Sequence, residues 1–287
     1  MFKNNFSYLP FGVDTIGLNI CPLYVNTEMW EKGSLKRTNM KSHNGAVYYH
    51  SEEIKKIGES DFITLVKTRN PFNNCCSLFS IRIQQEVLLH QMNYLQQIVQ
   101  ILLELAEEGF LIFPHEINYS ELYFWLTSSL ANICSLTRLD LYMDFKENDF
   151  FQQNSTISID HKPINTTYSP DHKQHRSLWA CYDRRKRLID KNQMKHFRAN
   201  ALEYPIRLEI RFDLYNFGNY LCLNLLNGTF LQIAENLTPT IAKSWRKYKA
   251  YMTKGYNNNT YYNPFFNFIE YWSTQKHIPQ SIIGMTL

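Results

Sequence analysis

The residues best suited to chemistry lie in two charged runs, and the first is Arg138-Leu139-Asp140-Leu141-Tyr142-Met143-Asp144. Arg138, Asp140 and Asp144 stand at even spacing, so in an extended strand their side chains share one face. Mg²⁺ and Mn²⁺ prefer carboxylate oxygens, so this face could hold a hard divalent metal. A solvent-facing strand with a local ion pair explains the same spacing and is kept as the alternative.

The second charged run places Arg207, Glu209, Arg211 and Asp213 at alternate positions. Taken alone, it fits an edge strand that is protected by charges. Two strands that each project carboxylates and arginines are better explained as sheet neighbours, with acids converging on a metal and arginines on phosphate. We therefore expect the two strands to be adjacent and antiparallel. The opposite face is expected to be buried, through Leu139, Leu141, Leu208 and Ile210.

Basic side chains cluster after the strand expected at 177–183 and on the helix expected at 237–252. They are Arg184, Arg185, Lys186, Arg187, Lys247 and Lys249. Clustered cations gain affinity for nucleic acid by releasing its counterions, so these residues are predicted to bind DNA phosphates. A solvated helix start is the alternative. The net charge of the chain is only +4, so DNA binding would need a locally basic face.

Four short motifs follow one another along the chain: Val13-Asp14-Thr15, the run from Arg138 to Asp144, Cys181-Tyr182-Asp183-Arg184, and Arg207-Leu208-Glu209-Ile210-Arg211. Their order and spacing resemble the replication-initiation factor (Rep_trans) family of rolling-circle plasmids, filamentous phages and related relaxases. Members of that family nick one DNA strand at an origin, form a 5′-phosphotyrosyl link and require a divalent metal. The family usually has Lys where this chain has Arg184.

The resemblance implies roles for individual residues. Asp140 and Asp144, one or both, would hold Mg²⁺ or Mn²⁺ together with Glu209. Three arginines would steady the negative transition state: Arg138, Arg207 and Arg211.

The nucleophile implied by the family order is a tyrosine that follows the Glu209 strand. Tyr256 is favoured and Tyr251 is the second choice. The chain has 19 tyrosines, and an aromatic turn that packs the C-terminal segment onto the sheet is the competing interpretation.

The function implied is DNA nicking and strand joining at a replication origin, through a metal-assisted tyrosine transesterification. The expected partner is origin DNA, single-stranded or cruciform, with a host helicase and a second copy of the chain as further candidates. Two alternatives stay open: a metal-dependent nuclease that uses water, and a DNA-binding relative without catalysis. The two-histidine metal cluster of other nicking enzymes is excluded, because none of the nine histidines forms a His-hydrophobic-His triplet.

The elements that would position these residues are read from apolar periodicity and turn residues. Strands are expected at 13–20, 62–67, 78–88, 135–145, 177–183 and 204–214, the second and third forming a hairpin. Helices are expected at 92–109, ending at Gly109, at 119–132, capped by Ser120, and at 237–252. Residues 26–60 are expected to be irregular, and 146–176 are expected to form a loop with at most one short hairpin. The order predicts an α+β fold with an antiparallel sheet and helices on one face. One Rep_trans-like domain over 1–287 is expected, with similar halves at 1–133 and 134–287 as the variant.

Composition limits the cellular setting. Hydrophobic residues make up 44% of the chain, enough for a substantial core. The six cysteines are scattered without a C-x-x-C pair, which indicates reduced thiols in a cytoplasmic protein. The N-terminal residues lack the apolar run of a signal peptide, and the most apolar stretch, 98–105, is too short to span a bilayer. No membrane association is expected.

Overall fold

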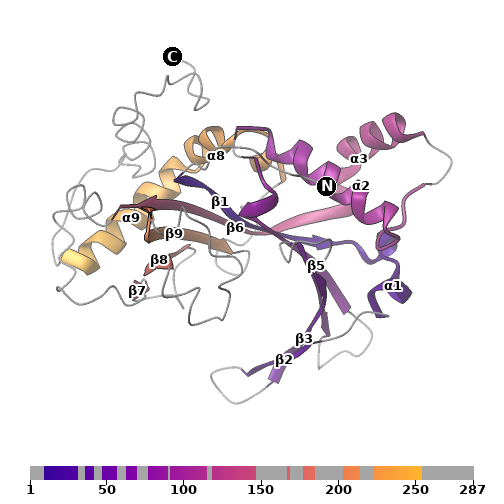
Figure 1. Ribbon diagram of the computed structural model, residues 1–287, viewed down its shortest axis with the longest axis horizontal. Coiled ribbons are helices and arrows are strands. Elements are labelled where there is room, and N and C mark those ends of the chain that lie inside the picture. Colours follow the sequence, from indigo (N-terminus) through magenta and orange to yellow (C-terminus); the bar gives the residue numbers. More distant parts are fainter. Residues whose placement is uncertain are drawn as a thin grey trace. The chain divides into compact units, whose positions relative to one another are not determined.

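The structure is a computed structural model that describes residues 10–31, 36–41, 47–56, 63–69, 77–89, 91–114, 118–146, 167–168, 177–184, 203–213 and 223–253. These residues form strands and helices, which confirms the predicted α+β class (Figure 1). The chain divides into two compact units. Unit 1 consists of Met1–Asp14, Asp140–Gly218 and Phe230–Leu287, and unit 2 of Thr15–Leu139 and Asn219–Thr229. The assignment of a single domain over 1–287, or of halves at 1–133 and 134–287, stays a prediction.

Two long strands contribute one end to each unit. They are β1 (Phe11–Ile20) and β6 (Cys134–Phe145). In unit 2 they approach so closely that a Cβ on Gly17 would lie 2.9 Å from the Cβ of Arg138, which favours glycine at that position. β1 was expected to be half-buried, but most of its residues are buried on both faces because it is a central strand.

The sheet of unit 2 runs in the order β2-β3-β4-β5-β1-β6. The predicted hairpin is confirmed, because β4 (Ile63–Arg69) pairs antiparallel with β5 (Ser77–Gln84). The prediction that 26–60 is irregular was wrong. This segment contains α1 (Thr27–Glu31), β2 (Lys36–Lys41) and β3 (Val47–Lys56), and both strands pair antiparallel at the end of the sheet. The polar sequences of β2 and β3 lack apolar alternation, so the sequence pattern did not reveal these strands.

The helices of unit 2 include the predicted pair, α2 (Tyr94–Glu107) and α3 (Tyr119–Ile133), which contact each other. α2 ends as predicted, with Gly109 at a positive φ of 82°. α3 is capped by Asn118 rather than by the predicted Ser120, because Asn118 and Glu121 form a reciprocal capping box. Short 3-10 turns lie at η1 (Pro22–Tyr24), η2 (Gln85–Val87) and η5 (Leu223–Leu226).

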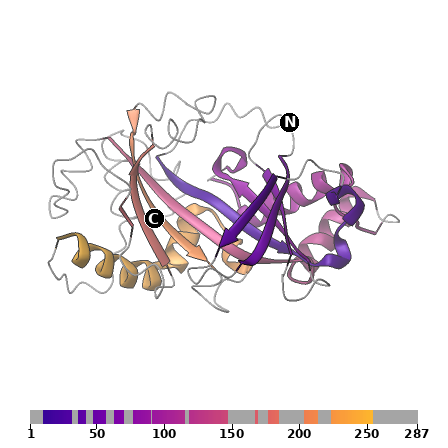
Figure 2. The same ribbon diagram turned by 90° about the horizontal axis from the view of Figure 1, so that it is seen from below.

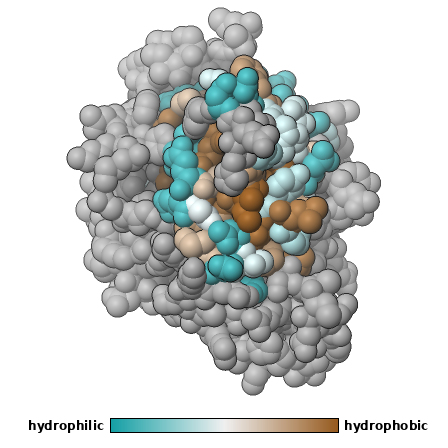
Figure 3. Space-filling model, turned by 90° about the vertical axis from the view of Figure 1, so that its right-hand side faces the viewer, coloured by the Kyte–Doolittle hydropathy of each residue, from teal (hydrophilic) through white to brown (hydrophobic). Residues whose placement is uncertain are grey.

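Unit 2 also exposes several large apolar side chains. Figure 3 shows brown side chains grouped among teal ones on the side of the molecule that lies at the right of Figure 1. The most exposed are Leu23, at 84%, and Phe124 on α3, at 72%. None of the helices in the described part of the chain combines the length and the apolar composition needed to cross a bilayer.

The sheet of unit 1 runs in the order β1-β6-β9-β8-β7, where β7 is Thr167–Tyr168, β8 is Ser177–Asp183 and β9 is Ile206–Asp213. β9 pairs antiparallel with β8 on one side and lies beside β6 on the other. Arg207 contacts Asp144 while Arg211 contacts Asp140, so the residue numbers run in opposite directions and β6 and β9 are antiparallel as predicted. β9 is therefore not an edge strand.

Two helices pack against the sheet of unit 1: α8 (Phe230–Asn236) and α9 (Thr238–Thr253), the second close to its predicted range. In Figure 2 the orange helix α9 lies next to strands of this unit. The ring of Phe230 lies 5.5 Å from that of Phe11, and the ring of Trp179 on β8 lies 4.9 Å from that of Trp245 on α9. Trp179 also donates a hydrogen bond to the hydroxyl of Ser244. The odd-numbered residues of β1 and β8 thus face these helices, and the even-numbered ones face the other way.

The alternation predicted for β6 and β9 is confirmed. The expected apolar residues are buried: Leu139, Leu141, Leu208 and Ile210. The charged face is not solvated, however, because Asp140 and Asp144 have no exposed surface. This rules out the solvent-facing strand as an explanation for the first charged run.

Candidate metal centre

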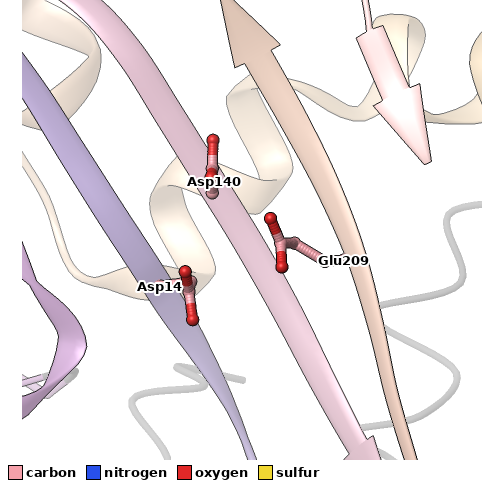
Figure 4. A group of neighbouring side chains, drawn as sticks. All are labelled: Asp14, Asp140 and Glu209. Carbon is pink, nitrogen blue, oxygen red and sulfur yellow. The ribbon is translucent and has the colours of Figure 1, made fainter. Parts of the chain in front are cut away.

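Three acidic side chains from three neighbouring strands of unit 1 meet on one sheet face. Asp14 comes from β1, Asp140 from β6 and Glu209 from β9, and each offers an oxygen within 4.8 Å of the other two (Figure 4). We call these residues the carboxylate triad. Asp140 and Glu209 are buried, while the side chain of Asp14 is 22% exposed. Asp14 is therefore the most exposed of the three carboxylates.

The donor set suits a hard divalent cation. Carboxylate oxygens are the ligands that Mg²⁺ and Mn²⁺ prefer, and oxygens on opposite sides of Mg²⁺ lie about 4.2 Å apart. Oxygens within 4.8 Å of one another would need shifts of less than about an ångström to share one ion. Grouped buried carboxylates repel one another, so this site needs compensating cations, either an ion or neighbouring basic side chains.

Asp144 was predicted as a candidate ligand, but it stands outside the triad. Its two oxygens accept hydrogen bonds from Nε and Nη2 of Arg207, at 2.7 and 2.8 Å, and Nη1 of Arg184 lies 2.9 Å from Oδ2. Two guanidinium groups therefore occupy this carboxylate. Asp144 is four residues from Asp140 along β6, so it lies on the same face but too far along the strand to share an ion with it.

Arg207 links the Asp144 pair to the triad. Its Nη1 contacts Asp14, and its guanidinium carbon lies 3.9 Å from the centre of the Tyr142 ring. Burial lowers the pKa of Arg207, but Asp144, Tyr182 and Asp14 together more than offset this, Asp144 most of all, and raise the pKa well above its usual value. Arg207 is consequently a permanent buried cation that holds Asp14.

Tyr142 cannot supply a phenolate at neutral pH. Burial raises the pKa of its hydroxyl far above the usual value, and the opposing effect of Arg207 is smaller. Its ring serves instead as the surface on which Arg207 stacks.

Arg211 and Tyr182 bind the inner members of the triad. Arg211 donates from Nε to Asp140 and from Nη2 to Glu209, both at 3.1 Å. The hydroxyl of Tyr182 donates to the other oxygen of Glu209 at 2.9 Å. Burial lowers the pKa of Arg211, but Asp140 and Glu209 more than offset this and raise it above the usual value. We call the seven charged residues together the arginine–carboxylate network: Asp14, Asp140, Asp144, Arg184, Arg207, Glu209 and Arg211.

The other predicted site residues lie elsewhere or outside the described residues. Arg138 belongs to the segment of β6 that forms part of unit 2. The backbone of Tyr251, Lys247 and Lys249 lies in α9, while their side chains are outside the described residues. Four predicted residues fall wholly outside: Arg185, Lys186, Arg187 and Tyr256.

Two residues of the site were not assigned a role from the sequence. Asp14 formed part of the Val13-Asp14-Thr15 motif, and its acidic side chain within an apolar strand was the signal for a ligand. Tyr182 formed part of the third motif, but nothing in the sequence indicated that its hydroxyl reaches Glu209.

The chain matches no protein-family model, no curated protein and no solved structure.

Proposed function

We propose that this protein is a divalent-metal-dependent phosphodiester transferase that nicks and rejoins DNA, as its resemblance to replication-initiation factors implies. The observation that carries the proposal is the convergence of Asp14, Asp140 and Glu209 beside the Arg211 guanidinium. Mg²⁺ or Mn²⁺ in the triad would polarise the scissile phosphate as a Lewis acid. Guanidinium groups suit the same substrate, since their planar fork matches phosphate oxygens.

Tyr182 joins Tyr256 and Tyr251 as a candidate nucleophile. The hydroxyl of Tyr182 donates a hydrogen bond to Glu209, a triad carboxylate. In the transfer step its phenol oxygen would bond to phosphorus while the P–O3′ bond breaks. The phenol proton would pass to Glu209, and the departing 3′-oxygen would take a proton from water, leaving a 5′-phosphotyrosyl link. Rejoining the strand reverses these transfers.

The proposal is tested with supercoiled origin-type DNA and a denaturing gel that retains covalent adducts. Asp14→Asn, Asp140→Asn and Glu209→Gln should each abolish nicking in Mg²⁺ or Mn²⁺, because a lost ligand weakens metal binding. DNA binding should change little. Unchanged nicking in all three variants would refute the metal assignment. Arg82→Gln, an exposed change on β5, is the control.

The nucleophile is identified by comparing Tyr182→Phe, Tyr251→Phe and Tyr256→Phe. The substitution that abolishes the covalent adduct while metal binding persists identifies the attacking tyrosine. Nicking without any adduct in the unmodified chain would favour a nuclease that uses water, the first alternative.

A non-catalytic DNA-binding protein is the second alternative, and one observation favours it. Each carboxylate of the triad already binds an arginine or a tyrosine, so the network could stabilise the sheet without an ion. Such a protein would bind DNA equally well with a chelator and would not nick it. A cytoplasmic location fits either function, since the cysteines among the described residues are free thiols.

A further inference from the structure

The two arginines on β9 are held in different ways. Arg207 has partners outside the triad: Asp144 binds it through two hydrogen bonds and the Tyr142 ring lies beneath it. Only 4% of its side chain is exposed. A cation that bound the triad would leave these contacts intact.

Arg211 differs because both carboxylates that accept its hydrogen bonds belong to the triad. Its guanidinium spans Asp140 and Glu209, from two different strands, and 28% of its side chain is exposed. A divalent ion between the three carboxylates would draw on the same two residues and would repel the guanidinium. The ion and Arg211 therefore compete for Asp140 and Glu209.

We propose that Arg211 is an exchangeable cation: it neutralises Asp140 and Glu209 when no metal is present, and metal binding releases it to hold a phosphate of the nucleic acid. This inference rests on the proposed function and adds an order of events to it. Asp140 and Glu209 stay compensated throughout, since a doubly charged ion replaces the singly charged guanidinium at these carboxylates. The released guanidinium needs a new anion, and the side chain is already partly open to solvent. Arg211 thereby couples metal loading to phosphate binding.

The first test is calorimetric titration of the full chain with Mn²⁺. Arg211→Gln should bind Mn²⁺ roughly tenfold more tightly than the unmodified chain, because the ion no longer has to displace two charge-assisted hydrogen bonds. Arg211→Lys should also bind more tightly than the unmodified chain, since one ammonium cannot span both carboxylates as the fork does. If Arg211→Gln does not fold, Arg211→Lys provides the same test. Arg82→Gln, which removes an exposed arginine from β5, should leave Mn²⁺ affinity unchanged.

The second test measures the binding of a labelled single-stranded oligonucleotide, with Mn²⁺ and with a chelator. Without metal, Arg211→Gln should bind the DNA as the unmodified chain does, because Arg211 is then occupied by the triad. With Mn²⁺ it should bind the DNA several-fold more weakly, on the order of one lost phosphate contact. An equal loss with and without Mn²⁺ would overturn the exchange, because Arg211 would then be available without metal.

The outcomes separate this inference from the proposed function. If the unmodified chain binds Mn²⁺ and the Arg211 variants bind it equally or more weakly, Arg211 supports the site rather than competing for it, and only the exchange is wrong. If neither the unmodified chain nor any variant binds Mn²⁺, the metal centre itself is wrong and both proposals fall.

Discussion

β1 and β6 run through both units, yet their two ends have opposite chemistry. In unit 2, β1 buries Ile16, Leu18 and Ile20 as ordinary apolar core. In unit 1, the same two strands bring Asp14 and Asp140 into a buried network of ions. The described part of unit 2 also buries one cation, Lys67, which lies 5.9 Å from the Phe79 ring.

The difference indicates that the residues at the unit 1 ends of β1 and β6 serve a purpose other than stability. Apolar side chains stabilise a sheet at about 25 cal/mol for each Å² that they bury, and unit 2 follows that rule. Buried ion pairs often do no better than well-packed apolar residues of the same volume. Four carboxylates and three guanidinium groups in unit 1 are therefore poorly explained as packing, which is why we look for a ligand there.

The largest expected effect comes from breaking the network at its most buried cation. Arg207→Ala would remove the bidentate partner of Asp144, which keeps its contact with Arg184, and the Arg207 contact of Asp14. Removing one member of a buried pair costs roughly 3–5 kcal/mol, and we expect a loss of that size in the free energy of unfolding by urea. The exposed change Arg82→Ala should have little effect on the same measurement. A small loss for Arg207→Ala would mean that the network is more solvated than its burial indicates.

The matching change in unit 2 removes apolar volume. Leu102 on α2 is fully buried, and Leu102→Ala should destabilise the chain by about 2–5 kcal/mol through lost burial and a new cavity. Metal affinity should stay unchanged, because Leu102 belongs to unit 2 and the triad to unit 1. Calorimetric Mn²⁺ titration of the variant separates the two effects. If Leu102→Ala also lowered Mn²⁺ affinity, the packing of unit 2 would affect the metal site in unit 1, contrary to this prediction.

Apolar alternation predicted most of the fold that surrounds the site. It located β6, β8 and β9 and the packed faces of both charged strands, because alternation and burial are linked by the geometry of a strand. It failed for β2 and β3, whose polar sequences carry no such pattern. It also misjudged β1, since a strand buried on both faces gives a nearly continuous apolar run.

The site was predicted in part, for a physical reason. Even spacing shows that Asp140, Asp144 and Glu209 share a face, but not which of them stand opposite one another. That depends on strand register, and in the structure Arg207 reaches Asp144 while Arg211 reaches Asp140. A one-dimensional pattern contains no register, so Asp144 was interpreted as a ligand and Asp14 was missed.

A smaller effect is expected where unit 2 depends on backbone conformation alone. Gly109 ends α2 at a φ of 82°, which side chains other than glycine rarely adopt. Gly109→Ala should destabilise the chain by roughly 1–2 kcal/mol. A Cβ there would be 3.9 Å from the nearest atom of Met29, so steric overlap adds nothing to this cost. Urea unfolding measures the loss, and the absence of any loss would show that the helix end can relax.

The smallest effect is expected from two buried thiols, one in each unit. Burial raises the pKa of Cys134 in unit 2 and of Cys181 in unit 1 from 9.0 to about 12. Each thiol therefore stays protonated in the folded chain at a pH where it ionises in the unfolded chain. Its contribution to stability is fully present below pH 9 and is lost as the pH rises from 9 towards 12.

Cys134→Ala and Cys181→Ala should each remove the alkaline loss in the free energy of unfolding that is caused by one thiol. That loss is about 1.4 kcal/mol at pH 10 relative to neutral pH. The measurement is urea unfolding of both variants and the unmodified chain at neutral pH and at pH 10. The cost of the small cavity is the same at both pH values, so it cancels when the two free energies of unfolding are subtracted. If residues 1–287 unfold as one domain, both substitutions alter the same transition. Two transitions, each altered by one substitution, would show that the units unfold separately in spite of sharing β1 and β6. An alkaline slope that neither substitution alters would mean that both thiols reach solvent, so that β6 at Cys134 and β8 at Cys181 are more open than their burial indicates.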